Sequence, residues 1–422
     1  MTAETIVEFP FTVQRFSGFA DWRGRLDRER IPPVIAVAGS RGKTSVLRVV
    51  ESMLRAGDFR FASWTDGGVE IEGQRQRGEI GPWSRVRTRL TSGGLDVALR
   101  EIDWATLRAV GAPGGSYPLV AVSNLCANNE ACLIAPEIAV ARSALGRIRE
   151  SVGETGRLVL NADDFAVSGY GSVAAPDRYL VGISADTPVL RRHMQLGGDS
   201  CYLDDDTIVI REDQIPTSVA SLRDLGWTRR GAIPFAAQNA LIATAIARGC
   251  GLSLETIRAG LEAHSPQPAL SPGSFNVFEL GSSLVVVDRP APSWFLRTTL
   301  RAVTNLGGGR HIRLAGPMVD VYTDDLFEVG RLLGRVGGVL IAHGAWSDER
   351  LNLFRSGASS NDVPPLFLMA ADELGALRQA LGMLRTNDVL LMLAENPSPA
   401  IRQIERRRAR LETGAATDVG AA

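Results

Sequence analysis

One stretch near the N-terminus decides the fold class: Val34-Ile35-Ala36-Val37-Ala38-Gly39-Ser40-Arg41-Gly42-Lys43-Thr44-Ser45. Residues 34–38 are apolar and partly β-branched, which predicts a buried strand. Residues 45–54 carry apolar side chains at helical spacing, which predicts a helix directly after the glycine-rich turn. A strand, a glycine loop and a helix in this order are typical of a phosphate-binding loop, whose backbone N–H groups face the anion. The residues of this loop that we predict to bind phosphate are Gly39, Ser40, Arg41, Gly42, Lys43, Thr44 and Ser45.

Lys43 is the one lysine of the chain, although lysine and arginine together number 46. An ammonium is a compact point charge, whereas a guanidinium is a wide planar fork, so a closely wrapped phosphate loop admits the first and not the second. We therefore interpret Lys43 as the catalytic phosphate ligand, since chance survival of one lysine would rarely leave it between Gly42 and Thr44. The hydroxyl of Thr44 can ligate Mg²⁺, and Arg41 either contacts phosphate or makes a surface ion pair.

Composition is that of an ordinary globular protein of about two or three domains. Of 422 residues, 45% are hydrophobic and 22% are charged, and a net charge of −1 provides no field for nucleic acid or an acidic membrane. We expect a cytoplasmic protein without direct membrane insertion, because no apolar run approaches ~18 residues and no secretory signal is present. The four cysteines form no C-x-x-C pair, which predicts free buried thiols. The arginine cluster at 406–410 is predicted to be a solvated helix face rather than a nucleic-acid site.

Strands and helices alternate along the chain, which predicts an α/β fold with a mostly parallel sheet covered on both faces. We expect an N-terminal extension without periodic signal over 1–32, a central domain over 33–264, a C-terminal domain over 274–412 and a disordered tail over 413–422. A segment rich in proline and serine, 264–273, marks the boundary. The central domain is predicted to hold strands at 95–101, 119–124 and 157–161, a helix at 136–150, a small β excursion at 179–232, and helices at 237–247 and 254–263. The C-terminal domain is predicted to hold strands near 284–288, 310–314, 338–342 and 388–393 and helices near 293–304, 323–334, 372–384 and 398–412.

Several short motifs along the chain resemble those of the Mur ligase superfamily of ATP-dependent amide ligases. Residues 39–45 are similar to the family's G-T-N-G-K-[TS] loop, with two residues rather than four between the glycines of the common phosphate loop. The further matches are Leu158 with Asn161-Ala162-Asp163-Asp164, the helix-like stretch 239–245, Val287-Asp288, and Trp64-Thr65-Asp66-Gly67-Gly68 for a T-T-G loop. The resemblance covers residues 33 to about 410.

Within this superfamily, the chain most resembles the ligase subunit of poly-γ-glutamate synthase. The phosphate loop begins at Gly39, which leaves no room for a preceding uridine-nucleotide-binding domain. The loop sequence Ser40-Arg41-Gly42-Lys43 is also similar to that of capsule-type ligases. The N-terminal membrane segment of that subunit is not found here. The resemblance implies a phosphate-loop central domain followed by a smaller Rossmann-like C-terminal domain.

The resemblance also implies the chemistry. ATP phosphorylates a substrate carboxylate, an incoming amine attacks the acyl phosphate, and an amide forms with release of ADP and phosphate. The cofactors would be ATP and Mg²⁺, the substrates an amino acid or peptide, and the partners other subunits of a membrane-associated synthase; no nucleic acid is involved.

Three residues outside the loop are assigned roles by this resemblance. Glu101 would ligate Mg²⁺ with Thr44, or it could pair with an arginine instead. Asn239 would contact adenine, although a helix cap explains it almost as well. Asp288 would accept a hydrogen bond from the ribose, with a strand-end turn as the alternative. Asp163 and Asp164 either hold a turn or line the nucleotide site, and we favour the turn.

The chain also departs from the family. No histidine directly follows the strand at 119–124, where Asn128 or Glu130 is a candidate oxygen ligand for substrate or metal. A carbamylated lysine is impossible, and Arg142 occupies its expected position, where it could bind a substrate carboxylate or phosphate. Arg289-Pro290-Ala291-Pro292 replaces the family's A-H-N-P residues. A divergent ligase is therefore our first hypothesis, and an ATP-binding regulatory or scaffold subunit is the second. An unrelated phosphate-loop kinase is disfavoured, since no arginine-rich lid is evident.

Overall fold

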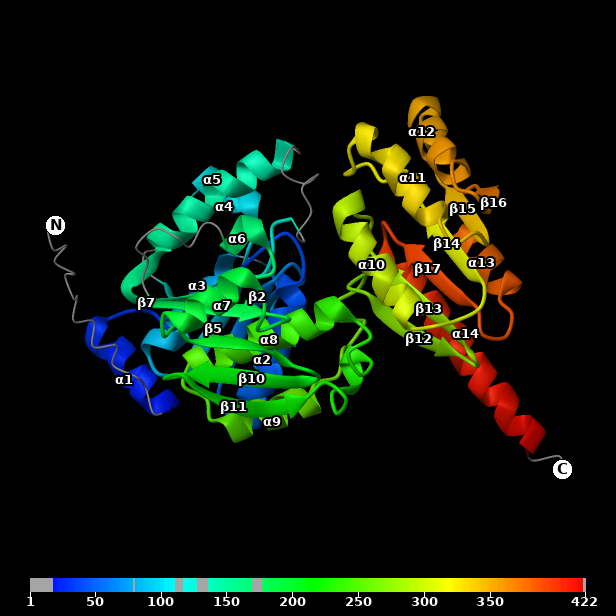
Figure 1. The fold of residues 1–422 in the computed structure, drawn as a ribbon. Coiled ribbons are helices and arrows are strands. Elements are labelled where there is room, and N and C mark those ends of the chain that lie inside the picture. The colour runs from blue at the N-terminus through cyan, green and yellow to red at the C-terminus, as the bar shows by residue number, and fades with distance from the viewer. Residues whose placement is uncertain (1–17, 79, 111–116, 127–135, 169–176, 420–422) are drawn as a thin grey trace, which may run out of the picture.

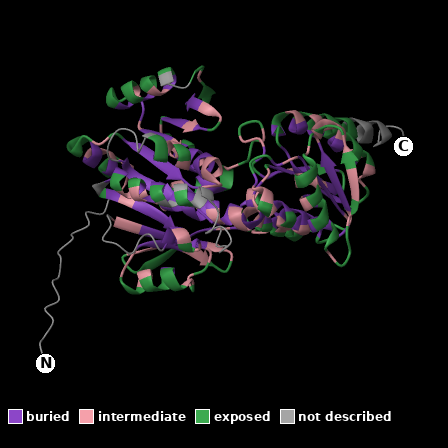
Figure 2. Ribbon diagram, turned by 90° about the horizontal axis from the view of Figure 1, so that it is seen from above, coloured by how far each residue is buried: buried purple, intermediate pink, exposed green. Residues whose placement is uncertain are grey.

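The structure is a computed structural model that describes residues 18–78, 80–110, 117–126, 136–168 and 177–419. Two β-sheets, each packed between helices, form a large and a small lobe joined by the chain around residues 264–275 (Figure 1). The strands are mostly buried and the outer helix faces exposed (Figure 2). The predicted α/β fold class is therefore confirmed, with a mostly parallel sheet followed by a smaller Rossmann-like unit.

The large lobe has an 11-stranded sheet in the order β11-β10-β9-β8-β7-β6-β1-β5-β2-β3-β4. β1 (Val34–Ala38) lies between β5 (Val97–Ile102) and β6 (Tyr117–Val122), is parallel to both, and is buried along its whole length. The parallel core also contains β2 (Phe61–Thr65), β7 (Val152–Asn161), β8 (Asp177–Gly182) and β9 (Ser200–Asp204). Antiparallel pairs finish both edges: β3 (Gly68–Ile71) with β4 (Gln74–Arg75), and β10 (Thr207–Glu212) with β11 (Ile215–Ser221).

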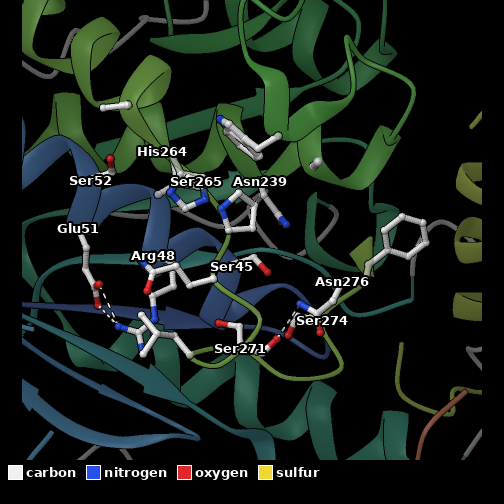
Figure 3. Close-up of a pocket in the computed structure, with 18 of the residues that line it drawn as sticks. Ser45, Arg48, Glu51, Ser52, Asn239, His264, Ser265, Ser271, Ser274 and Asn276 are labelled. Atoms are coloured by element: carbon white, nitrogen blue, oxygen red, sulfur yellow. Dashed lines mark hydrogen bonds and ion pairs between the residues drawn. The ribbon is translucent and has the colours of Figure 1, made fainter. Parts of the chain in front are cut away.

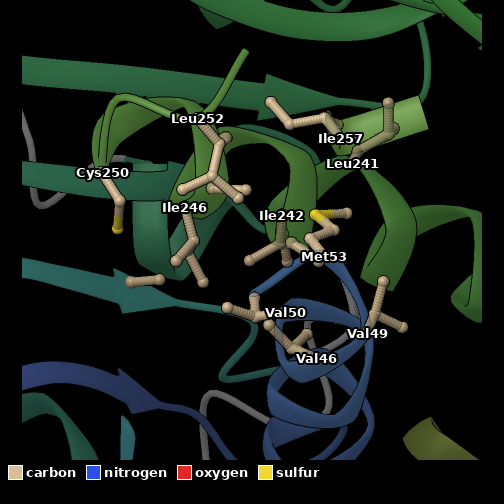
Figure 4. Close-up of a cluster of buried hydrophobic side chains, with 14 of the residues drawn as sticks. Val46, Val49, Val50, Met53, Leu241, Ile242, Ile246, Cys250, Leu252 and Ile257 are labelled. Carbon is tan, nitrogen blue, oxygen red and sulfur yellow. The ribbon is translucent and has the colours of Figure 1, made fainter. Parts of the chain in front are cut away.

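Helices cover both faces of this sheet, because β1 sends alternate side chains to opposite sides. Ile35 and Val37 join the cluster under α2 (Lys43–Ala56), α8 (Pro234–Gly249) and α9 (Leu254–Ala263). In that cluster, Val46, Val50 and Met53 of α2 meet Ile242 and Ile246 of α8 (Figure 4). The other face packs on α3 (Ile80–Thr91), α4 (Trp104–Val110) and α5 (Pro136–Ser151), with α6 (Phe165–Ser168) and α7 (Pro188–Gln195) beside them.

A helix that the sequence analysis missed precedes β1. α1 (Phe19–Glu29) buries Trp22 and Leu26 against the core, and Phe19 contacts Phe59 with ring centroids 4.0 Å apart. The apolar spacing covers only about two turns, which is too short for a clear periodic signal. Part of the segment that we interpreted as an N-terminal extension therefore contributes to the core of the large lobe.

The small lobe has a six-stranded sheet in the order β12-β13-β17-β14-β15-β16. β12 (Asn276–Leu280) is antiparallel at one edge, and the others are parallel: β13 (Ser283–Asp288), β17 (Val389–Leu393), β14 (His311–Ala315), β15 (Val339–His343) and β16 (Leu366–Ala370). α10 (Ser293–Asn305), α11 (Leu326–Gly334) and α12 (Asp348–Ser359) cover one face. α13 (Glu373–Met383) and α14 (Pro397–Val419) cover the other, and α14 extends into the residues expected to be a disordered tail.

The cysteine prediction holds in part. Cys201 and Cys250 are free and buried, whereas Cys126 is disulfide-bonded, so the expectation of free thiols is wrong for this residue. Composition cannot reveal which thiols approach one another in the fold. None of the described helices is long and apolar enough to cross a membrane.

Candidate nucleotide and metal site

The phosphate loop leaves the carboxyl end of β1 and is held in shape by the end of β6. The backbone N–H of Arg41 donates to Asn124 Oδ1 at 3.0 Å, and Asn124 Nδ2 donates back to the Arg41 carbonyl at 2.9 Å. Ser123 Oγ also donates to that carbonyl at 2.9 Å. Neither Ser123 nor Asn124 was predicted as a site residue; their position directly after a buried strand was the signal available.

Two glycines of the loop have no room for a side chain. Gly39 has φ +149°, and a Cβ there would lie 2.0 Å from Ser123 Oγ. Gly42, the N-cap of α2, has φ +83°, and a Cβ there would lie 2.8 Å from Asn239 Oδ1. Both backbone conformations favour glycine, and both positions bring the loop close to another element. Asn239 therefore lies directly against the loop, on the buried side of α8.

Lys43 begins α2 and reaches back over the loop, where Nζ donates to the Gly39 carbonyl at 3.0 Å. It lies near two carboxyl groups at the carboxyl end of β5, Glu101 and Asp103, and its charge opposes the rise that burial causes in the pKa of Glu101. Against the effect of burial, hydrogen bonds from Thr106 and the charge of Lys43 lower the pKa of Asp103. The ammonium therefore lies beside the loop, with acidic groups near it.

Glu101 lies at the register position of Val37 in β1, one strand away from the loop. Its Oε2 accepts from the backbone N–H of Asp66 at 3.1 Å, while Oε1 is buried and accepts no hydrogen bond from any described residue. Burial raises the pKa of Glu101 to about 7; the Thr44 hydroxyl and Lys43 oppose this shift, and the charge of Asp66 adds to it. A buried carboxylate oxygen without a partner, next to a hydroxyl, is a donor set that fits a hard divalent cation.

The protein alone does not complete such a site. No group of three or more His, Cys, Asp or Glu side chains that could hold a metal occurs among the residues that the structure describes. Glu101 and Thr44 therefore fit Mg²⁺ only if further oxygens, such as those of nucleotide phosphates, join them.

The small lobe closes the site from the other side. Asp288, at the end of β13, accepts from Thr299 Oγ1 at 2.9 Å and lies 3.8 Å from Arg41 Nη1. Arg41 also donates to the Arg289 carbonyl at 3.3 Å. The contact between Arg41 and Arg289 joins residues 248 positions apart. A cavity of about 240 Å³ lies between the lobes and is lined by loop residues 40–45 with Asn239, Asp288 and Phe295.

A second cavity of about 590 Å³ continues from the first along α2. The two share five lining residues: Ser45, Phe235, Asn239, Ser274 and Phe275. Figure 3 shows Ser45, Arg48 and Glu51 along one side of this cavity, with Asn239 near them. Arg48 is buried and pairs with Glu51 at 3.0 Å and with Glu70 at 2.6 Å, so its charge is neutralised within the protein.

The remaining predicted residues have different outcomes. Asp164 accepts from the backbone N–H groups of Leu125 and Cys126, and Asp163 accepts from that of Ile183, so the interpretation of this pair as structural is confirmed. Asn128 and Glu130 lie outside the described residues. Arg142 belongs to α5, but its side chain is outside the described part of the structure.

The chain is similar in sequence to known synthetases and ligases. No protein-family model matches the chain. The cyanophycin synthetase of Synechocystis sp. is 26% identical over 384 residues, which cover 89% of this chain and 44% of that protein. The UDP-N-acetylmuramoylalanine--D-glutamate ligase of Thermobifida fusca is 29% identical over 248 residues, or 56% of this chain and 45% of that enzyme. The chain thus spans less than half the length of these relatives.

The fold has solved counterparts. The structure of a pseudomurein peptide ligase type C from Methanothermus fervidus superposes with a TM-score of 0.61 and 15% identity, covering 89% of this chain and 78% of that one. The specific likeness to the poly-γ-glutamate synthase subunit stays a prediction. The sequence similarity to these ligases and the shared fold confirm the resemblance to the Mur ligase superfamily that the motifs predict.

Proposed function

We propose that this protein is an ATP- and Mg²⁺-dependent ligase that joins a carboxylate to an amine and releases ADP and phosphate. A carboxylate oxygen of the acid attacks the γ-phosphorus of ATP, and ADP leaves. The amine nitrogen then attacks the acyl carbon, loses a proton, and phosphate leaves as the amide forms. One observation carries the proposal: the Lys43 loop shares a cavity with Asn239 and with Asp288 of the other lobe.

Different residues of the site would bind different parts of ATP and the metal ion. Lys43 and the N–H groups of residues 39–45 would bind the β- and γ-phosphates and neutralise the charge that develops during transfer. Asn239 would bind the base, which extends toward the larger cavity, and Asp288 would accept from a ribose hydroxyl. Glu101 and Thr44 would hold Mg²⁺, which would offset the negative charge of the phosphates when bound.

The acid and the amine are amino acids or peptides, with γ-linked glutamate chain extension as the specific candidate. Partner subunits at a membrane-associated synthase would receive or supply the chain, and the reaction would take place in the cytoplasm. An ATP-binding subunit without ligase activity is the alternative, favoured by the missing histidine and by the absence of any lysine besides Lys43.

The experiment traps the intermediate and needs no knowledge of the amine. The protein is incubated with ATP, Mg²⁺ and hydroxylamine, together with aspartate, glutamate or their short peptides, and hydroxamate and ADP are measured. We expect both products in equal amounts from the wild type and neither from Lys43→Met. Tight ATP binding with no hydroxamate and no ADP from any acid would support the non-catalytic alternative.

The raised pKa of Glu101 leads to an expectation for how magnesium binding depends on pH. The pKa of about 7 means that a proton occupies the carboxyl group below this pH and must leave before the cation binds. We expect the Kd of Mg²⁺ for the protein–ATP complex to rise by about tenfold per pH unit below pH 7, and to level off above it. Calorimetric titration between pH 5.5 and 8.5 measures this.

Glu101→Gln is the matched control for that profile. Glutamine cannot lose a proton, so the variant should bind Mg²⁺ weakly at every pH and keep only the slope that ATP itself contributes. Equal slopes in the wild type and in Glu101→Gln would exclude Glu101 as a magnesium ligand.

Substitution of Asn239 is expected to weaken the binding of ATP moderately. Asn239→Ala removes the one amide that lines both cavities, so we expect the Kd for ATP to rise by about fivefold to tenfold, as for loss of one or two hydrogen bonds. Gln195→Ala, on the exposed end of α7, is the control and should bind ATP normally. Unchanged ATP affinity in Asn239→Ala would reduce this residue to a packing role.

A further inference from the structure

A third cavity adjoins the phosphate loop and is not explained by nucleotide binding. Its volume is about 670 Å³, and it shares only Ser40 and Lys43 with the smaller nucleotide cavity. Its other wall comes from the segment after β5, with Asp103, Trp104 and Arg108. Lys43 thus lines two cavities, so a ligand in the third cavity would meet the nucleotide at the ammonium group.

The wall of this cavity is tied to the phosphate loop. Trp104 Nε1 donates to Ser40 Oγ at 3.1 Å, and Ser40 Oγ donates to the Leu125 carbonyl at 3.1 Å. The indole is half-buried and fixed by this chain of bonds. It therefore provides a rigid apolar surface beside Lys43, suited to the methylene groups of a small ligand.

The charges of the cavity favour an anion. Asp103 lies directly before α4, and its carboxylate is hydrogen-bonded to the first turn of this helix. It accepts from the Thr106 N–H at 2.7 Å and from Thr106 Oγ1 at 2.6 Å. The guanidinium of Arg108 is exposed and donates no hydrogen bond to any residue in the described part of the chain. The backbone of Arg108 is held in place, since Arg147 Nη1 donates to the Arg108 carbonyl at 3.1 Å. Lys43 and Arg108 are the two cations that line the cavity.

We propose that this cavity binds the acid substrate, and that the acid carries two carboxylates. One carboxylate reaches Lys43, where it can attack the γ-phosphate, and Arg108 binds the second. The substrate class is thus an acidic amino acid, or a peptide that ends in one. Arg108 is a specificity-determining residue in this scheme, because a guanidinium holds a carboxylate bidentately and gains little from a neutral amide. The inference rests on the proposed ligase function.

The test compares diacids with their mono-amides. Glutamate, glutamine and glutamic acid α-amide, with the corresponding aspartate set, are assayed by hydroxamate formation with wild type, Arg108→Ala and Arg108→Lys. In Arg108→Ala we expect kcat/KM for the best diacid to fall by about tenfold or more, mainly through KM, as for loss of a charge-assisted hydrogen bond. The values for the mono-amides and the KM for ATP should not change, and Arg108→Lys should recover part of the loss.

Two further measurements separate this inference from the proposed function. Arg191→Ala, on the exposed face of α7, is the matched control and should behave as wild type. Binding of the same acids to the protein with Mg²⁺ and a non-hydrolysable ATP analogue is measured by calorimetry, which does not need turnover. Absence of hydroxamate with all acids would defeat the ligase proposal. Equal affinity for diacids and mono-amides in wild type, or an unchanged ratio in Arg108→Ala, would overturn the dicarboxylate site even if the enzyme is active.

Discussion

Lys43→Arg is expected to abolish ATP turnover, with a loss of about a thousandfold or more, similar to removal of a central charge-stabilising donor. The substitution keeps the charge and changes only its shape. In the structure, Nζ lies over the loop and donates to the Gly39 carbonyl at 3.0 Å, while Asn239 closes the loop on the side of Gly42. We expect that a planar guanidinium with five donors does not fit at this position, where a single nitrogen would have to reach from the loop backbone to a phosphate.

Three variants give this prediction its controls. Lys43→Met should be as inactive as Lys43→Arg, which would show that shape matters as much as charge. Arg41→Lys, the reverse exchange in the same loop, should retain most activity, because Arg41 is partly exposed and lies as far as 3.8 Å from Asp288. ADP release and ATP affinity are measured for all three. Undiminished ATP affinity and turnover in Lys43→Arg would contradict the interpretation of the loop.

Gly39→Ala is expected to harm both stability and nucleotide binding. The new Cβ would meet Ser123 Oγ at 2.0 Å, and alanine would have to adopt φ +149°. We expect the free energy of unfolding to fall by roughly 3 kcal/mol, near the upper end for a strained backbone position. Because the loop must shift to relieve the contact, ATP affinity should fall by about a hundredfold, the equivalent of two lost charge-assisted hydrogen bonds. Urea denaturation and calorimetry measure the two effects.

Two controls separate the sources of the Gly39 effect. The double variant Gly39→Ala with Ser123→Ala removes the side-chain contact and keeps the backbone strain, so it should recover only part of the stability. Gly93→Ala tests backbone strain alone, because Gly93 has φ +72° and nothing lies within 4 Å of its added Cβ. It should cost about 1 kcal/mol and leave ATP binding unchanged. Normal ATP affinity in Gly39→Ala would mean that the loop tolerates a side chain there.

The local patterns of the sequence predicted the central elements well. The apolar run at 34–38 is β1, the helical spacing after the loop is α2, and the alanine-rich stretch around residue 240 is α8. These elements bury nearly every apolar side chain, so periodicity reports them directly. α12 was missed for the opposite reason. It contacts α11 through Gly357, whose added Cβ would lie 1.9 Å from the Phe327 carbonyl, and a close backbone approach leaves no apolar pattern.

The α/β class, the phosphate loop with its one lysine, and the order of the motifs follow from the sequence alone, because each depends on neighbours a few positions apart. Which groups face the loop depends on the tertiary structure. Within the described part of the chain, one buried carboxylate oxygen of Glu101 accepts no hydrogen bond. Asn124 holds the loop across 83 positions, and Asp288 approaches Arg41 from the other lobe. Such contacts arise when parallel strands end at one edge of a sheet and two lobes meet there, and no local spacing encodes that distance.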